Sequence, residues 1–526
     1  MRMRSLALLR NAPDAVPAGR AGIGARRGWG PSPRAFAVQL AFILLALLAS
    51  RPYLVGDFFE YWLTTIAIAR HGTPDVRADD AALAAALAPD ANYRALFDGI
   101  RDDIARGGKD SLPGLHRGKD GDMFPIHFFA YPALAAPAFR LLQGVGANPM
   151  KAFQVVNFAA FWLLGLVLHR FFGSARRAFV GLGLVLGTGG ILYINWGGPE
   201  MVTACACLAG TLLFVLGRPL AGGLLAGVAA MQNPSLVFVA AFAPLFSLLH
   251  DRAEGRPHPF TGWRAVLGDA RLHGALLLGV LALLPFAFGL WQWHVPSIIG
   301  RDWTDPHLVG PQRLFSYYFD LDQGMILAVP GILLLLAGIV PRRPVPRLAA
   351  VLALLFMLAL AVPTLSAQNW NPGGVGILRY VFWGAMPLLL LAFGWLRTRS
   401  RWPLALLCAA FALQAAAMVH AKKYGHTEFS PLARLVLAHA PALYNPDPEI
   451  FFERSRGTED GMDIHGVVVW PRQGPVRKVL FNVESRRVDE VLCPRGQRLS
   501  GALPLVERRD GWRYLNGAPA CVPAAP

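Results

Sequence analysis

Apolar runs of about 20 residues recur along this 526-residue chain and constrain its fold more than any other feature. A helix needs about 20 mostly apolar residues to cross the hydrocarbon core of a bilayer, which is about 30 Å thick. The runs lie at 35–54, 152–171, 179–196, 201–216, 220–249, 274–291, 325–340, 348–365, 380–396 and 402–419. The run at 220–249 is too long for one span and is interrupted by "MQNPS", so we expect two helices there and about 11 spans in all. The sequence therefore predicts an all-α polytopic membrane protein.

The basic residues indicate topology rather than a nucleic-acid partner. The formal net charge is +17, but Lys and Arg gather in short stretches between apolar runs, as in "HRFFGSARR" and "RTRSR". The positive-inside rule gives this distribution to cytoplasmic loops. We therefore expect membrane lipids as partners and no nucleic acid, with the N-terminus in the cytoplasm and the C-terminus on the other side.

Composition divides the chain into three regions. Residues 1–34 are rich in Arg, Gly, Pro and Ala, which predicts a disordered basic cytoplasmic tail. Residues 35–420 form the predicted transmembrane domain. Residues 421–526 are polar and contain short strand-like pieces, so we expect a small extracytoplasmic α/β or β-rich domain. Its two cysteines, Cys493 and Cys521, could form a disulfide if this region is extracytoplasmic.

The first predicted extracytoplasmic loop, residues 56–151, begins with two carboxylates. Asp57 and Glu60 lie three residues apart, so they would share one face of a helix and could address one ligand. The alternative is that they cap a helix at the membrane surface or pair with Arg51. The other unusual polar clusters fall on the same predicted side. Any active site is therefore expected at the extracytoplasmic membrane surface.

The order of these motifs resembles the GT-C superfamily of membrane glycosyltransferases, which includes protein O-mannosyltransferases and the transferases that add aminoarabinose to lipid A. "GDFFEYWLTTIAIARHGTPD" is similar to the acidic start of the first extracytoplasmic loop in that superfamily, and "DMFPIHFFAYPALAAPAFRLL" is similar to its interfacial helix. "LAGGLLAGVAAMQNPSLVF", "DLDQGMILAVPGILLL" and "GGVGILRYVFWGAMPLLLL" resemble the internal helix pair and the later loop-to-span junctions. The resemblance covers roughly residues 35–420.

The resemblance implies a glycosyltransferase that moves a sugar from a polyprenyl-phosphate carrier to an extracytoplasmic lipid, glycan or protein, usually with inversion, and it suggests a bacterial inner membrane. Such a displacement needs a base, for which we select Asp57; Glu60 would orient the sugar or acceptor. Some members of the superfamily use a divalent metal and others do not, and Asp57 and Glu60 would hold one if it is needed. A carboxylate beside a low-dielectric membrane surface is expected to have a raised pKa.

Further site residues follow from the same resemblance. Arg379 would bind the lipid phosphate through its guanidinium, or else snorkel to headgroups. Tyr380 would pack on the sugar or prenyl chain, or belong to an aromatic belt. His127 and Tyr131, expected one turn apart on the interfacial helix, would face the donor or serve as structural residues. Asp322 would shape the acceptor side or cap a helix.

Two alternatives from other classes stay open at this point. A transporter would carry ionisable residues near the middle of its spans and often internal repeats, whereas this chain keeps its charges at span ends. A catalytically silent GT-C relative could act in envelope assembly. No GxSxG, HExxH or P-loop motif occurs to indicate hydrolysis or nucleotide use.

Overall fold

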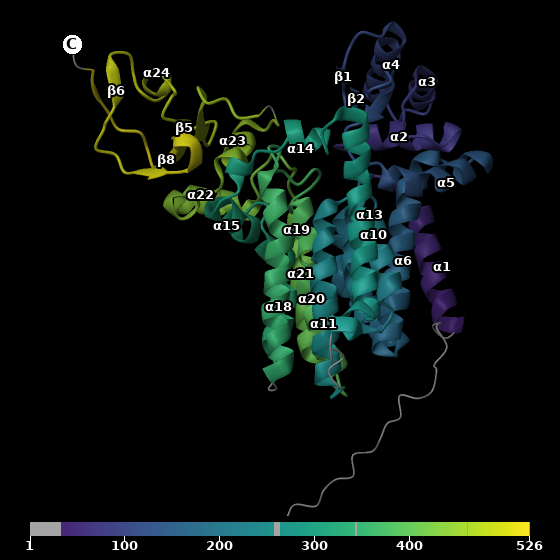
Figure 1. The fold of residues 1–526 in the computed structure, drawn as a ribbon. Coiled ribbons are helices and arrows are strands. Elements are labelled where there is room, and N and C mark those ends of the chain that lie inside the picture. Colours follow the sequence, from purple (N-terminus) through teal and green to yellow (C-terminus); the bar gives the residue numbers. More distant parts are fainter. Residues whose placement is uncertain (1–32, 257–262, 342–343, 460, 525–526) are drawn as a thin grey trace, which may run out of the picture.

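The computed structural model describes residues 33–256, 263–341, 344–459 and 461–524. The tail expected at 1–34 therefore lies almost wholly outside the described residues. The described chain is a bundle of roughly parallel and antiparallel helices, with smaller elements gathered at one end (Figure 1). We call this end the α2 end, after helix α2 (Phe58–His71), which lies across it.

The bundle helices follow the predicted apolar runs closely. They are α1 (Pro33–Ala49), α6 (Ala152–Phe172), α7 (Ala175–Val185), α8 (Ile191–Tyr193), α9 (Glu200–Val215), α10 (Pro219–Ala230), α11 (Val239–Ala253), α13 (Ala270–Trp293), α17 (Pro330–Ile339), α18 (Pro344–Ala361), α19 (Arg379–Gly384), α20 (Met386–Arg397) and α21 (Leu404–Ala421). Among the described residues, seven helices are long and apolar enough to cross a membrane, and four shorter apolar helices accompany them. The membrane-protein class is confirmed, and the count of 11 spans stays a prediction.

The break at "MQNPS" is present where the sequence predicts it. Helix α10 ends at Ala230, and a short 3-10 turn at Pro234–Phe238 opens the following helix. Proline cannot supply the backbone N–H that a continuing helix needs, so the chain turns there and comes back. Glycines let α10 pack closely on α13, because a Cβ at Gly223 would collide with the carbonyl of Gly274.

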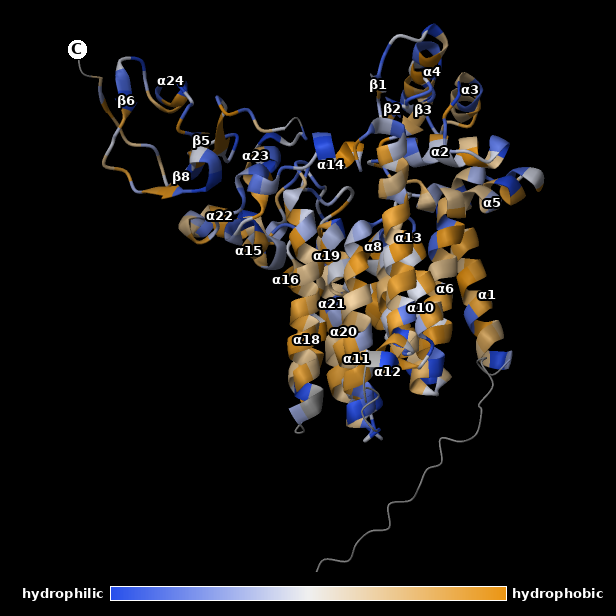
Figure 2. Cartoon of the chain, in the orientation of Figure 1, coloured by the Kyte–Doolittle hydropathy of each residue, from blue (hydrophilic) through white to orange (hydrophobic). Residues whose placement is uncertain are grey.

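The bundle helices are mostly apolar, as their orange colour in Figure 2 shows, and many of their large apolar side chains are exposed on the outside. Large side chains on the outside include Leu48, which is 74% exposed, and Leu283, which is 64% exposed. Contiguous apolar surface of this kind is unfavourable in water and matches the hydrocarbon core of a bilayer. The charged residues of the bundle lie mainly near the helix ends, which agrees with the predicted spans.

The first loop forms a compact layer over the α2 end. Its elements are α2, α3 (Ala78–Ala86), α4 (Ala91–Arg106), β1 (Ser111–Leu112), β2 (Leu115–Arg117), β3 (Met123–Pro125) and α5 (Ala130–Gly144). The three strands pair antiparallel in the order β1-β2-β3. The interfacial helix begins at Ala130 rather than near Met123, because the preceding residues pair with β2 as a strand. His127 therefore lies in the loop before α5, not one helical turn from Tyr131.

Three short helices, α14 (Ile298–Asp302), α15 (Pro311–Phe319) and α16 (Met325–Ala328), connect α13 to α17, and α12 (Trp263–Leu267) precedes α13. The C-terminal region adds α22 (Pro431–His439), α23 (Pro448–Arg456), α24 (Val488–Leu492) and two sheets. The larger sheet is antiparallel in the order β4 (Val467–Trp470), β5 (Lys478–Asn482), β8 (Trp512–Asn516), β7 (Leu505–Glu507). The smaller sheet pairs β6 (Gln497–Leu499) with β9 (Cys521–Pro523).

Every residue of β5 is buried, because both faces of this central strand are covered. Leu480 packs in the cluster that contains Phe451 of α23, whereas Val479 and Phe481 pack in a second cluster with α24. Alternate side chains of a strand point to opposite faces, so one strand serves both clusters. The small C-terminal sheet region that the sequence predicts is confirmed.

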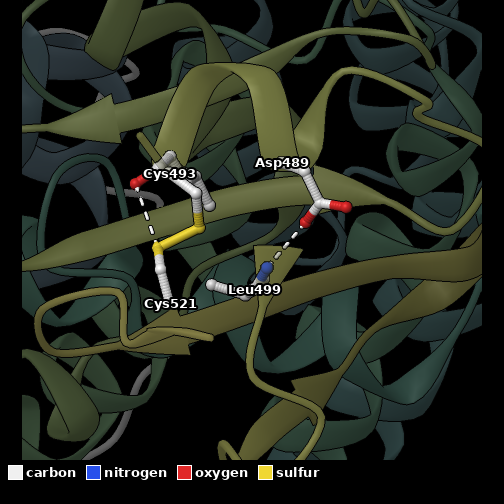
Figure 3. The surroundings of a disulfide bond; sticks show 5 residues. Asp489, Cys493, Leu499 and Cys521 are labelled. Atoms are coloured by element: carbon white, nitrogen blue, oxygen red, sulfur yellow. Dashed lines mark hydrogen bonds between the residues drawn. A yellow bond between two sulfur atoms is a disulfide. The ribbon is translucent and has the colours of Figure 1, made fainter. Parts of the chain in front are cut away.

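A disulfide joins Cys493, just after α24, to Cys521 in β9, with the two Cα atoms 5.7 Å apart (Figure 3). Beside it, the backbone N–H of Leu499 donates to Asp489 Oδ1 at 2.7 Å. Disulfides persist in oxidising compartments. The two cysteines that the sequence offers as a possible pair are thus joined in the structure.

Candidate active site

Asp57 lies at the point where the chain enters α2. Gly56 precedes it with a φ of 64°, a left-handed conformation that favours glycine, and Asp57 occupies the position just before the first helical residue. Here the chain runs beside two other loops. The N–H of Tyr53 donates to the Asn195 carbonyl at 2.8 Å, and a Cβ at Gly56 would contact the Gly373 carbonyl at 3.6 Å.

Two cationic side chains reach Asp57 from distant segments. Arg379 Nη1 donates to Asp57 Oδ2 at 3.1 Å, across 322 residues of sequence. His127 Nε2 lies 3.7 Å from the same oxygen. The Asp57 side chain is 31% exposed, so one face of the carboxylate remains accessible.

Glu60 lies behind His127 rather than beside the opening. Its Oε1 accepts the backbone N–H of His127 at 2.7 Å, and its Oε2 lies 2.7 Å from Nδ1 of the same residue. The Glu60 side chain is only 1% exposed. With both oxygens engaged and almost no open surface, Glu60 orients His127 and has no free face for a substrate.

The strand layer explains why His127 reaches α2. The turn between β1 and β2 presses on α2, since a Cβ at Gly114 would come within 3.0 Å of Glu60. The N–H of Ile126 donates to the Gly114 carbonyl at 3.0 Å, which sets the next residue over Glu60. The ring of His127 also packs edge-on to Tyr61, with ring centroids 5.8 Å apart.

Arg379 opens helix α19 at the α2 end. Its guanidinium lies 5.1 Å from the ring centroid of Tyr380, whose backbone carbonyl accepts the hydroxyl of Tyr317 at 2.9 Å. Nε of Arg379 is buried and has no hydrogen-bond partner among the described residues. A guanidinium carries five N–H donors, and among the described residues only Nη1 of this one has a hydrogen-bond acceptor, which is Asp57 Oδ2.

The electrostatic balance of the cluster follows from these contacts. Burial raises the pKa of Asp57, but the positive charges of His127 and Arg379 outweigh it, and the pKa lies below its usual value. The raised pKa expected for this carboxylate is therefore wrong. Burial lowers the pKa of His127, yet Glu60 and Asp57 raise it to about 9. Near neutral pH the cluster thus holds an ionised Asp57 beside a protonated His127.

Glu60 has a raised pKa, unlike Asp57. Its burial is the largest cause, and the charge and hydrogen bonds of His127 oppose it only in part. The two carboxylates, three residues apart in sequence, thus differ in both exposure and proton affinity. Only Asp57 combines an ionised state with an open face.

Glu200, the first residue of α9, is a polar group whose default interpretation from sequence was structural hydrogen bonding. It is 3% exposed, and its Oε2 has no hydrogen-bond partner among the described residues. Its charge interacts with those of Arg379 and Asp57. The "NWGGPE" pattern just before α9, with two glycines ahead of the carboxylate, was the signal available in the sequence.

The structure does not bring the other predicted residues into the cluster in the same way. Tyr131 is buried, its hydroxyl donating to Asn157 Oδ1 at 3.1 Å and its backbone N–H to Gln232. Asp322 lies in the loop before α16, where it contacts the C-terminal region: its Oδ1 accepts the N–H of Ser430 at 2.5 Å. Both have structural partners there. Tyr380 alone among these three contacts Arg379.

The donor set around Asp57 and Glu60 does not resemble a metal site. Divalent cations such as Mg²⁺ and Ca²⁺ bind several oxygen ligands at once. Here both carboxylates already face cations, and among the described residues there is no group of three His, Cys, Asp or Glu side chains that could hold a metal ion. A divalent ion would have to displace His127 or Arg379.

Comparison with known proteins gives a likeness of fold. No family model and no curated protein matches the chain. Two solved structures of ArnT from Cupriavidus metallidurans are similar to it. The one bound to undecaprenyl phosphate is 15% identical and covers 81% of this chain and 69% of its own, with a TM-score of 0.41. The apo structure is 16% identical and covers 80% and 67%, with a TM-score of 0.38.

Proposed function

We propose that this protein is a membrane glycosyltransferase that moves a sugar from a polyprenyl-phosphate carrier to an extracytoplasmic acceptor. The observation that carries the proposal is the pairing of Asp57 and Arg379 at the α2 end of an apolar bundle. The accessible, ionised carboxylate of Asp57 accepts a hydrogen bond from Arg379 there, and Nε of Arg379 has no partner among the described residues. The carboxylate can act as a base, and the guanidinium can stabilise an anionic leaving group at a membrane surface.

In this proposal Arg379 holds the phosphate of the donor. Nη1 stays on Asp57, and the remaining N–H groups bind phosphate oxygens, for which the planar guanidinium is suited. The phosphate and the base are then separated by the width of one guanidinium group. The anomeric carbon, which is bonded to the phosphate, lies next to Asp57.

The reaction is a single displacement with inversion. The acceptor oxygen forms a bond to the anomeric carbon as the bond from that carbon to the phosphate oxygen breaks, and the lipid phosphate leaves with the electron pair. Asp57 takes the proton of the acceptor hydroxyl. Its lowered pKa keeps it ionised across the neutral range, which is the state that can accept a proton. Arg379 stabilises the charge that develops on the leaving group.

Glu60 and His127 act as positioning residues. The two contacts from Glu60 fix the ring of His127, and the protonated ring holds Asp57 in place and ionised. Glu200 adds a buried carboxylate whose charge interacts with those of Arg379 and Asp57, and its Oε2 lacks a partner among the described residues.

We propose that the α2 end faces away from the cytoplasm in a bacterial inner membrane. Two observations support this orientation. The disulfide between Cys493 and Cys521 lies in the region that follows α21 on this side, and disulfides need an oxidising compartment. The other ends of the helices carry basic stretches such as "RTRSR", in agreement with the positive-inside rule.

The test is transfer of labelled sugar from a pool of polyprenyl-phosphate donors in membranes that contain the wild type, Asp57→Asn or Arg379→Ala at equal protein level. Wild-type transfer that falls by about 10²–10⁴-fold in Asp57→Asn supports the proposal. Asp80→Asn is the matched control, because Asp80 also contacts an arginine and a histidine but lies in a buried local cluster. Equal activity of Asp57→Asn and wild type removes Asp57 as the base. No wild-type transfer, even with native lipid extract, favours the transporter or the silent relative.

A further inference from the structure

The segment 367–378 leads directly into Arg379 and is held by residues of the C-terminal region. It contains no helix, and several of its backbone polar groups have hydrogen-bond partners outside the segment. The N–H of Trp370 donates to Glu449 Oε1 at 2.6 Å, and the Trp370 carbonyl accepts Gln323 Nε2 at 3.0 Å. Glu449 belongs to α23, almost 80 residues further along the chain.

A buried ion pair adds to these contacts of Glu449, which together we call the first clamp. Arg313 of α15 donates to Glu449 Oε2 at 2.8 Å, and their side chains are 0% and 5% exposed. The same arginine donates to the Ala367 carbonyl at 2.8 Å and lies over the Trp370 ring at 4.7 Å from its centroid. The pair Arg313–Glu449 therefore contacts the segment at both Ala367 and Trp370.

A second clamp lies closer to Arg379. Asn371 Nδ2 donates to Glu459 Oε1 at 3.0 Å, and His426 Nε2 lies 2.7 Å from the same oxygen. The other ring nitrogen of His426 lies 3.1 Å from the Gly374 carbonyl. Both clamp residues, His426 and Glu459, come from the C-terminal region.

The end of the segment is fixed against the bundle. The N–H of Leu378 donates to the Gln323 carbonyl at 3.1 Å, and Arg454 of α23 donates to the side chain of Gln323 at 2.6 Å. Gly373 lies against the stem of Arg379, since a Cβ at that glycine would be 3.5 Å from Arg379 Cδ. A shift of the segment would therefore displace the guanidinium of Arg379.

We propose that Glu449 and Glu459 are positioning residues through which the C-terminal domain sets the place of Arg379; this inference rests on the proposed function of Arg379. A buried ion pair adds little net stability compared with an apolar pair of similar size, whereas it fixes one geometry. Misplacement of a binding group by about 1 Å can lower a rate by about 10²-fold. In this inference, the C-terminal domain holds Arg379 in the position that binds the donor phosphate.

Asp447→Asn provides a matched control for Glu449→Gln in the full-length protein. Asp447 is a buried carboxylate at the start of the same helix and pairs with Arg509 at 3.1 Å, but among the described residues it makes no contact with the segment 367–378. Glu459→Gln is a second variant, because Glu459 is 38% exposed and its loss threatens folding less.

The first measurement is hydrogen exchange of the peptide that covers residues 367–379. We expect at least about 10-fold faster exchange in Glu449→Gln and Glu459→Gln than in wild type, and no change in Asp447→Asn. Unchanged exchange in both glutamate variants would overturn the inference whatever the donor proves to be.

The second measurement is binding of undecaprenyl phosphate, arranged as a double-mutant cycle with Arg379→Lys. We expect about 10-fold weaker binding in Glu449→Gln and little further loss when this change is made in Arg379→Lys, because both act through one guanidinium. Additive losses would show that Glu449 does not act through Arg379. Wild-type protein that fails to bind the lipid refutes the proposed function, while hydrogen exchange still decides whether the domain holds the segment.

Discussion

The Asp57 cluster and a second cluster around Asp80 are made from the same residue types but differ in origin. Asp80 contacts Arg70 at 2.9 Å and His71 at 3.0 Å, both from α2, about ten residues earlier in the chain. Its Oδ2 also accepts the N–H of Arg77 at 2.9 Å, so it caps the start of α3. This cluster is local, and its aspartate side chain is only 1% exposed.

The Asp57 cluster is assembled from three distant segments. Arg379 comes from α19 and His127 from the loop before α5, and the aspartate they meet is 31% exposed. Arg379 keeps a buried Nε without a partner among the described residues. The comparison teaches that an aspartate, an arginine and a histidine in contact do not define a site. The exposure of the aspartate, 31% for Asp57 against 1% for Asp80, distinguishes the binding cluster from the structural one.

The largest expected difference between the clusters concerns their arginines. Arg379→Lys keeps the positive charge but loses the planar donors, so we expect sugar transfer to fall by about 10²-fold. Arg70→Lys is the matched change in the Asp80 cluster and should leave transfer unchanged. Rates are measured per amount of folded protein in detergent or nanodiscs. Equal losses in both variants would mean that Arg379 is as structural as Arg70.

His127 should make the stability of the Asp57 cluster depend on pH. The pKa of His127 is raised from 6.5 to about 9, so its stabilising effect is complete below about pH 6.5 and is lost as the pH rises through about 9. The loss should be on the order of 1–3 kcal/mol. We expect the Tm of wild type to fall over this range and the fall to be smaller in His127→Gln. A His127→Gln profile parallel to wild type would contradict the assignment.

The smallest expected effect concerns Asp80. Asp80→Asn removes the charge that faces Arg70 and weakens the cap of α3, which should lower stability by about 1 kcal/mol. Transfer per folded protein should stay at the wild-type level. Thermal unfolding followed by circular dichroism gives the first quantity, and labelled-sugar transfer gives the second. A large loss of transfer at unchanged Tm would place Asp80 in the functional machinery and end the contrast between the clusters.

The sequence predicts local features well, because they depend on neighbours along the chain. The apolar runs mark the bundle helices, and "MQNPS" marks the break between α10 and α11. The strand-like pieces mark the sheet of the C-terminal region. The prediction fails where pairing overrides local preference: Met123–Pro125 reads as part of an apolar helix but pairs with β2. His127 is thereby moved from a helix face to a loop over Glu60.

The sequence by itself determined that this chain is a polytopic helical membrane protein and which carboxylates and arginine are candidates for its chemistry, since hydrophobic run length and charge placement follow from composition along the chain. The tertiary structure decided which of two neighbouring carboxylates is open. Glu60 is enclosed by His127, while Asp57 meets Arg379 across 322 residues. Burial, ion pairing and the resulting pKa values depend on which segments meet in space. The spacing of residues along the sequence does not indicate which segments meet.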